Sequence, residues 1–138
     1  MCDMVLKDHS IGVGEVVLVV DDEDCIRHIV RLILEARGYL VLDASNGLEG
    51  LAVCRNHLGR IDILLSDIVM PKLDGCALAA EAVELRPGLK VLLMSGYSDP
   101  AVMAKGSFRT APFLQKPFTM AALEQKVRSV LDSRPAAA

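Results

Sequence analysis

The sequence is poor in the residues that mark several large classes of protein. It has no tryptophan, and aromatic residues make up 4% of its 138 positions, so the core must be built from aliphatic side chains. No apolar run approaches the roughly 18 residues that a membrane-spanning helix needs. The first ten residues are too polar for a secretory signal. We therefore expect a cytoplasmic protein that has no membrane partner.

Basic residues and closely spaced cysteines are also scarce. The net charge is −3, which argues against the basic surface of a nucleic-acid-binding protein, so no nucleic-acid partner is expected. The 4 cysteines form no Cys-x-x-Cys pair and have no histidine at zinc-ligand spacing. We interpret them as reduced thiols that serve as small apolar residues: Cys2, Cys25, Cys54 and Cys76.

Short aliphatic runs alternate along the chain with segments of helical period. A hydrophobic fraction of 52% and a charged fraction of 24% indicate one globular domain, which we place at 16–132 between a leader at 1–15 and a tail at 133–138. The apolar runs predict strands at 16–20, 40–43, 61–66, 91–94 and 112–115. Helices are expected at 25–37, 47–57, 76–85 and 119–131, with Asp24 and Thr119 as the caps of the first and last.

This alternation predicts an α/β fold with a doubly wound, five-stranded parallel sheet and helices on both faces. We expect the flavodoxin-like strand order 2-1-3-4-5. In such sheets the ligand site lies beyond the carboxyl ends of the strands, near the switch in strand order.

Polar residues follow four of the five expected strands directly: Asp21 and Asp22, then Asp67, Ser95 and Lys116. Alone, each has an ordinary explanation as a helix cap, a turn residue, a loop hydroxyl or a surface lysine. Together they place three carboxylates around one crevice, although two like charges about 5 Å apart repel by roughly 3 kcal/mol at an effective dielectric of about 20. Magnesium would neutralise them, because it prefers oxygen ligands and keeps waters that a phosphate can replace. The set therefore predicts a site for a phosphoryl group.

These residues stand in four motifs: Val-Val-Asp21-Asp22-Glu, Leu-Leu-Ser-Asp67-Ile-Val-Met-Pro-Lys-Leu-Asp74-Gly75, Leu-Met-Ser95-Gly-Tyr and Leu-Gln-Lys116-Pro117-Phe. Together the motifs resemble those of a response-regulator receiver domain of two-component signalling. The resemblance covers about 15–131 and is very specific, because all four motifs occur in order at the family's spacing. The last two motifs are also similar in sequence to receiver modules of hybrid histidine kinases.

The resemblance implies a role for each site residue. Asp67 is the nucleophile that becomes the acyl phosphate. Lys116 and Ser95 contact phosphoryl oxygens, and the Lys116-Pro117 peptide is cis. Magnesium is held by Asp21, Asp22, Asp67 and the backbone carbonyl of Val69.

The resemblance also implies a switch and a partner. Ser95 and Phe113 are the switch residues, and the movement should lie between them. The residues themselves predict that 100–111 is its most mobile part, because a helix that begins at Pro100 would be short and would end at Gly106. The phosphoryl donor is a phosphohistidine on a sensor histidine kinase or a histidine phosphotransfer protein. The domain catalyses its own phosphorylation and slow dephosphorylation without being an enzyme with a released substrate. A weak homodimer is left open, as is the choice between a stand-alone regulator and a module of a hybrid kinase.

Four other functions fit the sequence less well. An aspartyl phosphatase carries an Asp-x-Asp motif after its first strand, whereas Asp21 and Asp22 are adjacent. A nucleotide-binding module would have its glycines after the first strand, but Gly12 and Gly14 precede it. A histidine kinase would need a kinase motif around His28. A receiver that works by protein contact alone would not need the complete acidic set.

Overall fold

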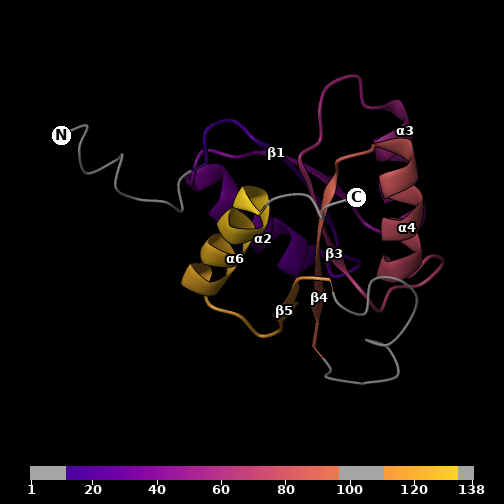
Figure 1. Cartoon of the computed structure of the whole chain (residues 1–138). Helices are drawn as coiled ribbons and strands as arrows, with labels where there is room; N and C mark the ends of the chain where they lie inside the picture. The colour runs from indigo at the N-terminus through magenta and orange to yellow at the C-terminus, as the bar shows by residue number, and fades with distance from the viewer. Residues whose placement is uncertain (1–11, 97–110, 134–138) are drawn as a thin grey trace.

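Five parallel strands form one sheet in the order β2-β1-β3-β4-β5, as predicted. Figure 1 shows the computed structural model, in which residues 12–96 and 111–133 are described. The strands are β1 Val16–Val20, β2 Leu40–Ala44, β3 Ile63–Asp67, β4 Lys90–Ser95 and β5 Phe113–Gln115. The helices are α2 Asp24–Ala36, α3 Gly47–Asn56, α4 Gly75–Leu85 and α6 Met120–Asp132. Each boundary lies within two residues of its expected place.

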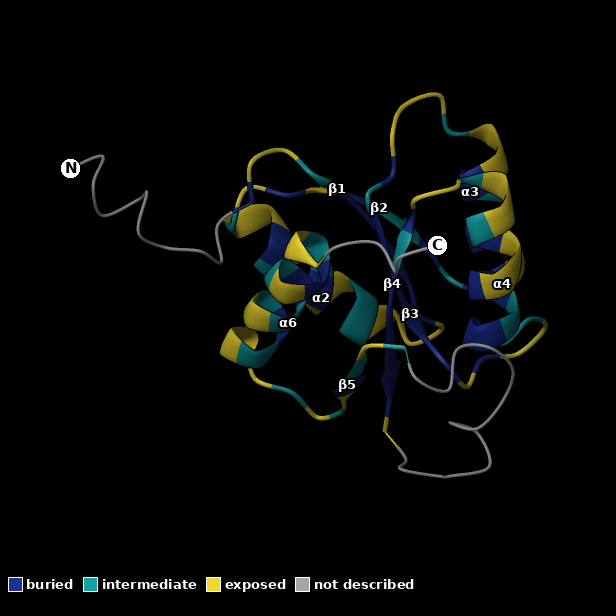
Figure 2. Ribbon diagram, viewed as in Figure 1, coloured by how far each residue is buried: buried dark blue, intermediate teal, exposed yellow. Residues whose placement is uncertain are grey.

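The helices cover both faces of the sheet, α2 and α6 on one and α3 and α4 on the other (Figure 1). Alternate residues of a strand point to opposite faces, so a strand between two helical layers must be apolar throughout. In β1, Leu18 and Val20 belong to the core under α3 and α4, whereas Val17 and Val19 belong to the core under α2 and α6. Figure 2 shows this buried layer between exposed helix surfaces.

The helix ends confirm one predicted cap and correct the other. The Thr119 side chain accepts the Ala122 N–H, as expected of the cap of α6. The N-cap of α2 is Glu23, and its side chain makes no capping hydrogen bond. The prediction of Asp24 as this cap was wrong, because Asp24 lies inside the first turn and its carboxylate pairs with Arg27 at 2.7 Å.

The ends of the domain stay a prediction, but the segment before β1 already contacts the folded part. The Gly12 N–H donates to the carbonyl oxygen of Arg37 at 2.6 Å, and the Glu15 carboxylate pairs with Arg128 in α6. Within the described residues, no helix is long and apolar enough to cross a membrane.

Candidate functional site

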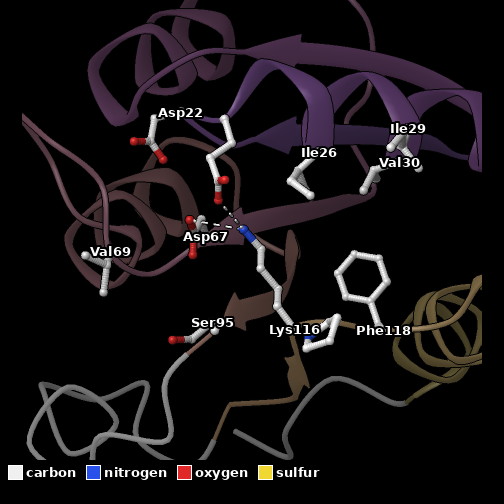
Figure 3. Close-up of a pocket in the computed structure, with 12 residues that line it drawn as sticks. Asp22, Ile26, Ile29, Val30, Asp67, Val69, Ser95, Lys116 and Phe118 are labelled. Carbon is white, nitrogen blue, oxygen red and sulfur yellow. Dashed lines mark hydrogen bonds and ion pairs between the residues drawn. The ribbon is translucent and has the colours of Figure 1, made fainter.

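The predicted site residues meet at one edge of the sheet, which we call the carboxyl edge. Asp21 directly follows β1, Asp67 ends β3, Ser95 ends β4 and Lys116 directly follows β5. All five strands are parallel, so these positions share an edge, and Figure 3 shows Lys116 extending toward Asp67. Carboxylate oxygens of Asp21, Asp22 and Asp67 lie within 4.8 Å of one another. This acidic cluster could hold a metal ion.

In the part of the chain that the structure describes, Lys116 is the cation that faces this cluster. Its Nζ lies 2.8 Å from Asp21 Oδ2, 3.3 Å from Asp67 Oδ2 and 3.6 Å from Glu23 Oε1. Burial lowers the pKa of Lys116, but the hydrogen bond to Asp21 and the charges of Asp67 and Asp21 outweigh burial, so that its pKa is raised. The ammonium group therefore stays charged at neutral pH.

The backbone helps to direct this lysine into the site. The Lys116-Pro117 peptide is cis, as the resemblance implies. The backbone N–H of Lys116 donates to the Ser95 carbonyl oxygen at 2.8 Å, which fixes the end of β5 beside the end of β4. Ser95 is buried and lines the same cavity as Lys116 and Asp67.

Asp67 is an unusually basic carboxylate. Its residue is 6% exposed, and burial is the main reason why the pKa of Asp67 is raised to about 6. The ammonium group of Lys116 opposes this rise in pKa, and the charges of Asp21 and Asp22 add to it. One lysine thus fails to compensate for burial and for two neighbouring carboxylates.

The turn after Asp67 is held by a close approach to α4. The Asp74 side chain accepts the Ala77 N–H at 2.8 Å and caps α4. The Gly75 N–H donates to the Ile68 carbonyl oxygen at 2.9 Å, and a Cβ atom at Gly75 would meet the Asp67 carbonyl oxygen at 2.2 Å. Position 75 must therefore be glycine for the nucleophile candidate to keep its place.

Two further predicted residues lie near the site, and one predicted segment lies outside the description. Val69 borders the cavity and is 53% exposed. Phe113 is half-buried at the start of β5. The segment 100–111, expected to be the mobile part of the switch, falls almost wholly outside the described residues.

The carboxyl-edge site opens into a cavity that also has apolar walls. The cavity has a volume of about 670 Å³ and extends from the carboxylates between α2 and the segment after β5 (Figure 3). The apolar lining, which sequence reasoning missed, includes Ile26, Ile29 and Phe118. Ile29 is 50% exposed, although its spacing from Ile26 and Ile33 is typical of the buried face of a helix. Glu23 was missed as well, although it extends the acidic run directly after Asp22.

Comparison with known proteins identifies the family. The family model for the response regulator receiver domain matches residues 17–128. The chain belongs to this family. The sheet order is that of a receiver domain of two-component systems, whose family function is to accept a phosphoryl group.

Several relatives share much of the receiver sequence. The sensor kinase CckA of Brucella abortus (strain 2308) is 36% identical over 134 residues, which cover 94% of this chain and 14% of that kinase. The response regulator receiver protein CpdR of the same organism is 35% identical, with 84% of this chain and 95% of that protein covered. The crystal structure of the receiver domain from the hybrid histidine kinase CckA has a TM-score of 0.72 and 34% identity, and covers 85% of this chain and 99% of that chain. The chain spans 27% to 48% of several transcriptional regulators that it also matches.

Proposed function

We propose that Asp67 accepts a phosphoryl group from a phosphohistidine on a sensor histidine kinase or a histidine phosphotransfer protein. The observation that carries this proposal is the position of Asp67, a buried carboxylate that faces Lys116 and ends the strand at the edge where Asp21 and Asp22 also lie. The similarity to the CckA receiver supports a histidine-kinase type of donor. A kinase forms its phosphohistidine from ATP, which is a cytoplasmic substrate. We therefore place the transfer to Asp67 in the cytoplasm.

The residues of the acidic cluster fit magnesium. Their oxygen atoms are hard ligands, and three carboxylates opposite one lysine leave an excess of negative charge. We assign Asp22, Asp67 and the backbone carbonyl of Val69 as holders of the ion. Asp21 would act with them through its charge or a water, because its Oδ1 accepts the Glu23 N–H and its Oδ2 accepts Lys116. When bound, the ion supplies positive charge against the repulsion between Asp67 and the incoming phosphoryl oxygens.

The transfer itself needs one bond to form and one to break. A carboxylate oxygen of Asp67 attacks phosphorus, the bond from phosphorus to the imidazole nitrogen breaks, and its electron pair stays on that nitrogen. Lys116 stabilises a phosphoryl oxygen with the ammonium group that it presents to Asp67, and Ser95 donates a hydrogen bond to another. The product stays on the chain, so the domain promotes its own modification and later hydrolysis and releases no substrate. Movement of Ser95 and Phe113 would then signal the modified state.

Chemical phosphorylation tests this proposal directly. The protein is incubated with acetyl phosphate and magnesium, and intact mass and peptide mapping locate the label. We expect one phosphoryl group on Asp67 and none in Asp67→Asn. Asp74→Asn is the matched control in the same loop, because asparagine also caps a helix well, and it should be labelled like the parent. Equal labelling of Asp67→Asn and the parent would refute the assignment.

A further inference from the structure

The turn between β1 and α2 carries two of the three carboxylates of the acidic cluster, Asp21 and Asp22. Contacts that fix the conformation of this turn therefore also fix the positions of these carboxylates. The turn holds together without a side-chain cap on α2. Asp21 is fully buried, and its backbone N–H donates to the Ala44 carbonyl oxygen at 3.3 Å. Its Oδ1 accepts the Glu23 N–H at 2.9 Å, and its Oδ2 accepts Lys116 at 2.8 Å. The remaining polar group of Asp21 is its backbone carbonyl.

Arg27 donates a hydrogen bond to that carbonyl. It lies one turn into α2 and reaches back over the start of the helix, where Nη1 donates to Asp21 O at 2.8 Å. Nη2 donates to Asp24 Oδ1 at 2.7 Å. The Arg27 side chain is 18% exposed, whereas that of Asp24 is 83% exposed. The guanidinium of Arg27 therefore packs against the turn and is largely shielded from solvent. The planar guanidinium thus clamps the residue before Asp22 to the first turn of α2.

We infer that Arg27 is a positioning residue for magnesium, acting through the backbone of Asp21 on the carboxylate of Asp22. The peptide that joins Asp21 to Asp22 includes the carbonyl that Arg27 binds. Rotation of that peptide would swing the Asp22 side chain relative to Asp67. The inference rests on the proposed function, because it concerns the magnesium site assigned there.

A purely electrostatic role and a positioning role for Arg27 predict opposite changes in magnesium affinity, so the inference can be tested. A positive charge beside a cation site repels the cation, so a purely electrostatic role for Arg27 predicts tighter magnesium binding when the charge is removed. A positioning role predicts weaker binding. Residues that orient metal ligands typically change metal affinity by about 10-fold or more when removed.

The experiment measures the magnesium dissociation constant of the purified chain by titration calorimetry. We expect Arg27→Met to raise this constant about 10-fold. Arg27→Lys should raise it less, since its ammonium group can still donate one hydrogen bond to the Asp21 carbonyl, although without the planar fork. Arg31→Met is the matched control, because Arg31 lies one turn further along α2 and pairs with Glu35 at 3.2 Å and Asp43 at 3.1 Å, away from the turn. It should stay within about twofold of the parent, since it orients no ligand.

Two further measurements separate positioning from general damage. Circular dichroism and thermal unfolding without magnesium show whether each variant folds, and Arg27→Lys stands in if Arg27→Met does not. At saturating magnesium, the rate of labelling by acetyl phosphate should approach that of the parent, because the two bonds of Arg27 go to Asp21 and Asp24 and not to the nucleophile.

The outcomes distinguish the inference from the function on which it rests. If the parent chain binds no magnesium, the proposed magnesium site itself is refuted. A parent that binds magnesium while folded Arg27→Met binds it equally well or more tightly would overturn the positioning role alone. Equal losses in Arg27→Met and Arg31→Met would also overturn it, because the effect would then follow from any lost arginine of α2.

Discussion

The two edges of the sheet both collect acidic residues, with opposite effects on their protonation. At the amino edge, defined here by Glu15 before β1 and Asp62 before β3, each carboxylate has an arginine. Glu15 Oε2 lies 2.7 Å from Arg128, and Asp62 Oδ1 lies 2.7 Å from Arg60. Burial would raise the pKa of both acids, but their hydrogen bonds outweigh burial and the pKa of each is lowered.

At the carboxyl edge, burial and repulsion outweigh the favourable contacts of Asp67, so its pKa is raised. Lys116 pairs with the carboxylates of Asp21, Asp67 and Glu23. Burial together with the charges of Asp21 and Asp22 raises the pKa of Asp67 to about 6. The acids of the amino edge therefore stabilise the fold when ionised, whereas ionised Asp67 destabilises it. A fold that keeps such a residue is expected where local stability is given up for function. The described residues thus leave the carboxyl-edge charge incompletely compensated, which supports the proposal that a cation binds there.

The largest expected effect is the stabilisation of the metal-free protein by Asp67→Asn. Asparagine keeps the shape of the side chain but removes the charge, so the variant avoids desolvation and the repulsion from Asp21 and Asp22. A pKa of about 6 against the ordinary 3.8 corresponds to about 2 to 3 kcal/mol at neutral pH. Urea unfolding at pH 7.5 with a chelator should show this increase in the free energy of unfolding.

Glu15→Gln is the matched control for that substitution at the other edge. It also replaces an acid by its amide, but Glu15 is paired, so the free energy of unfolding should fall. If both variants shifted stability in the same direction, the contrast between the edges would be lost.

The second prediction concerns the pH at which the Asp67→Asn effect appears. The folded pKa of Asp67 lies above the unfolded value, so protonated Asp67 contributes stability below pH 3.8, and this is lost as the pH rises through about 6. The difference between the parent and Asp67→Asn should be small near pH 4 and constant above about pH 7. Between these limits its slope should not exceed about 1.4 kcal/mol per pH unit, the value for one proton.

Unfolding curves of both proteins at intervals of half a pH unit, without magnesium, measure this difference. Glu15→Gln should show the opposite trend, since the folded pKa of Glu15 is lowered and its stabilisation is lost as the pH falls. A difference between parent and Asp67→Asn that is the same at pH 4 and pH 7 would assign the effect to packing instead of charge.

Sequence reasoning was strongest where one physical rule decides the outcome. Continuous aliphatic runs between helical segments predict a parallel sheet covered on both faces, and the expected order of the strands was confirmed. The same rule placed Asp67, Ser95 and Lys116 at one edge, because each directly ends or follows a strand. Nothing beyond their position along the chain was needed.

Contacts to backbone groups, and contacts between residues far apart in the chain, could not be predicted from the sequence. The sequence could not show that Arg27 binds the backbone carbonyl of Asp21, since a backbone oxygen leaves no trace in the sequence. The pairing of Glu15 with Arg128 spans 113 residues and depends on how α6 meets the start of β1. Helical periodicity identifies the apolar stripe to which Ile29 belongs, but it does not show the cavity that this residue lines.

The third prediction concerns a smaller effect, the loss of stability caused by Arg128→Met at the amino edge. The Glu15 and Arg128 side chains are 12% and 14% exposed, so their bond is shielded from water, and Met keeps most of the apolar length of the arginine. The lost charge-assisted hydrogen bond should lower the free energy of unfolding by about 1 kcal/mol. The bond of Arg128 to Asp132, which is 62% exposed, should add little.

A double-mutant cycle with Glu15→Gln isolates the pair, because the two losses should overlap instead of adding. Arg60→Met is the exposed counterpart, since its side chain is 70% exposed and Asp62 keeps the Val16 N–H at 2.8 Å. Its effect should therefore be smaller than that of Arg128→Met. Additive losses for Glu15→Gln and Arg128→Met would mean that the pair does not stabilise the fold. The amino edge would then resemble the carboxyl edge, as a set of charges that the fold tolerates.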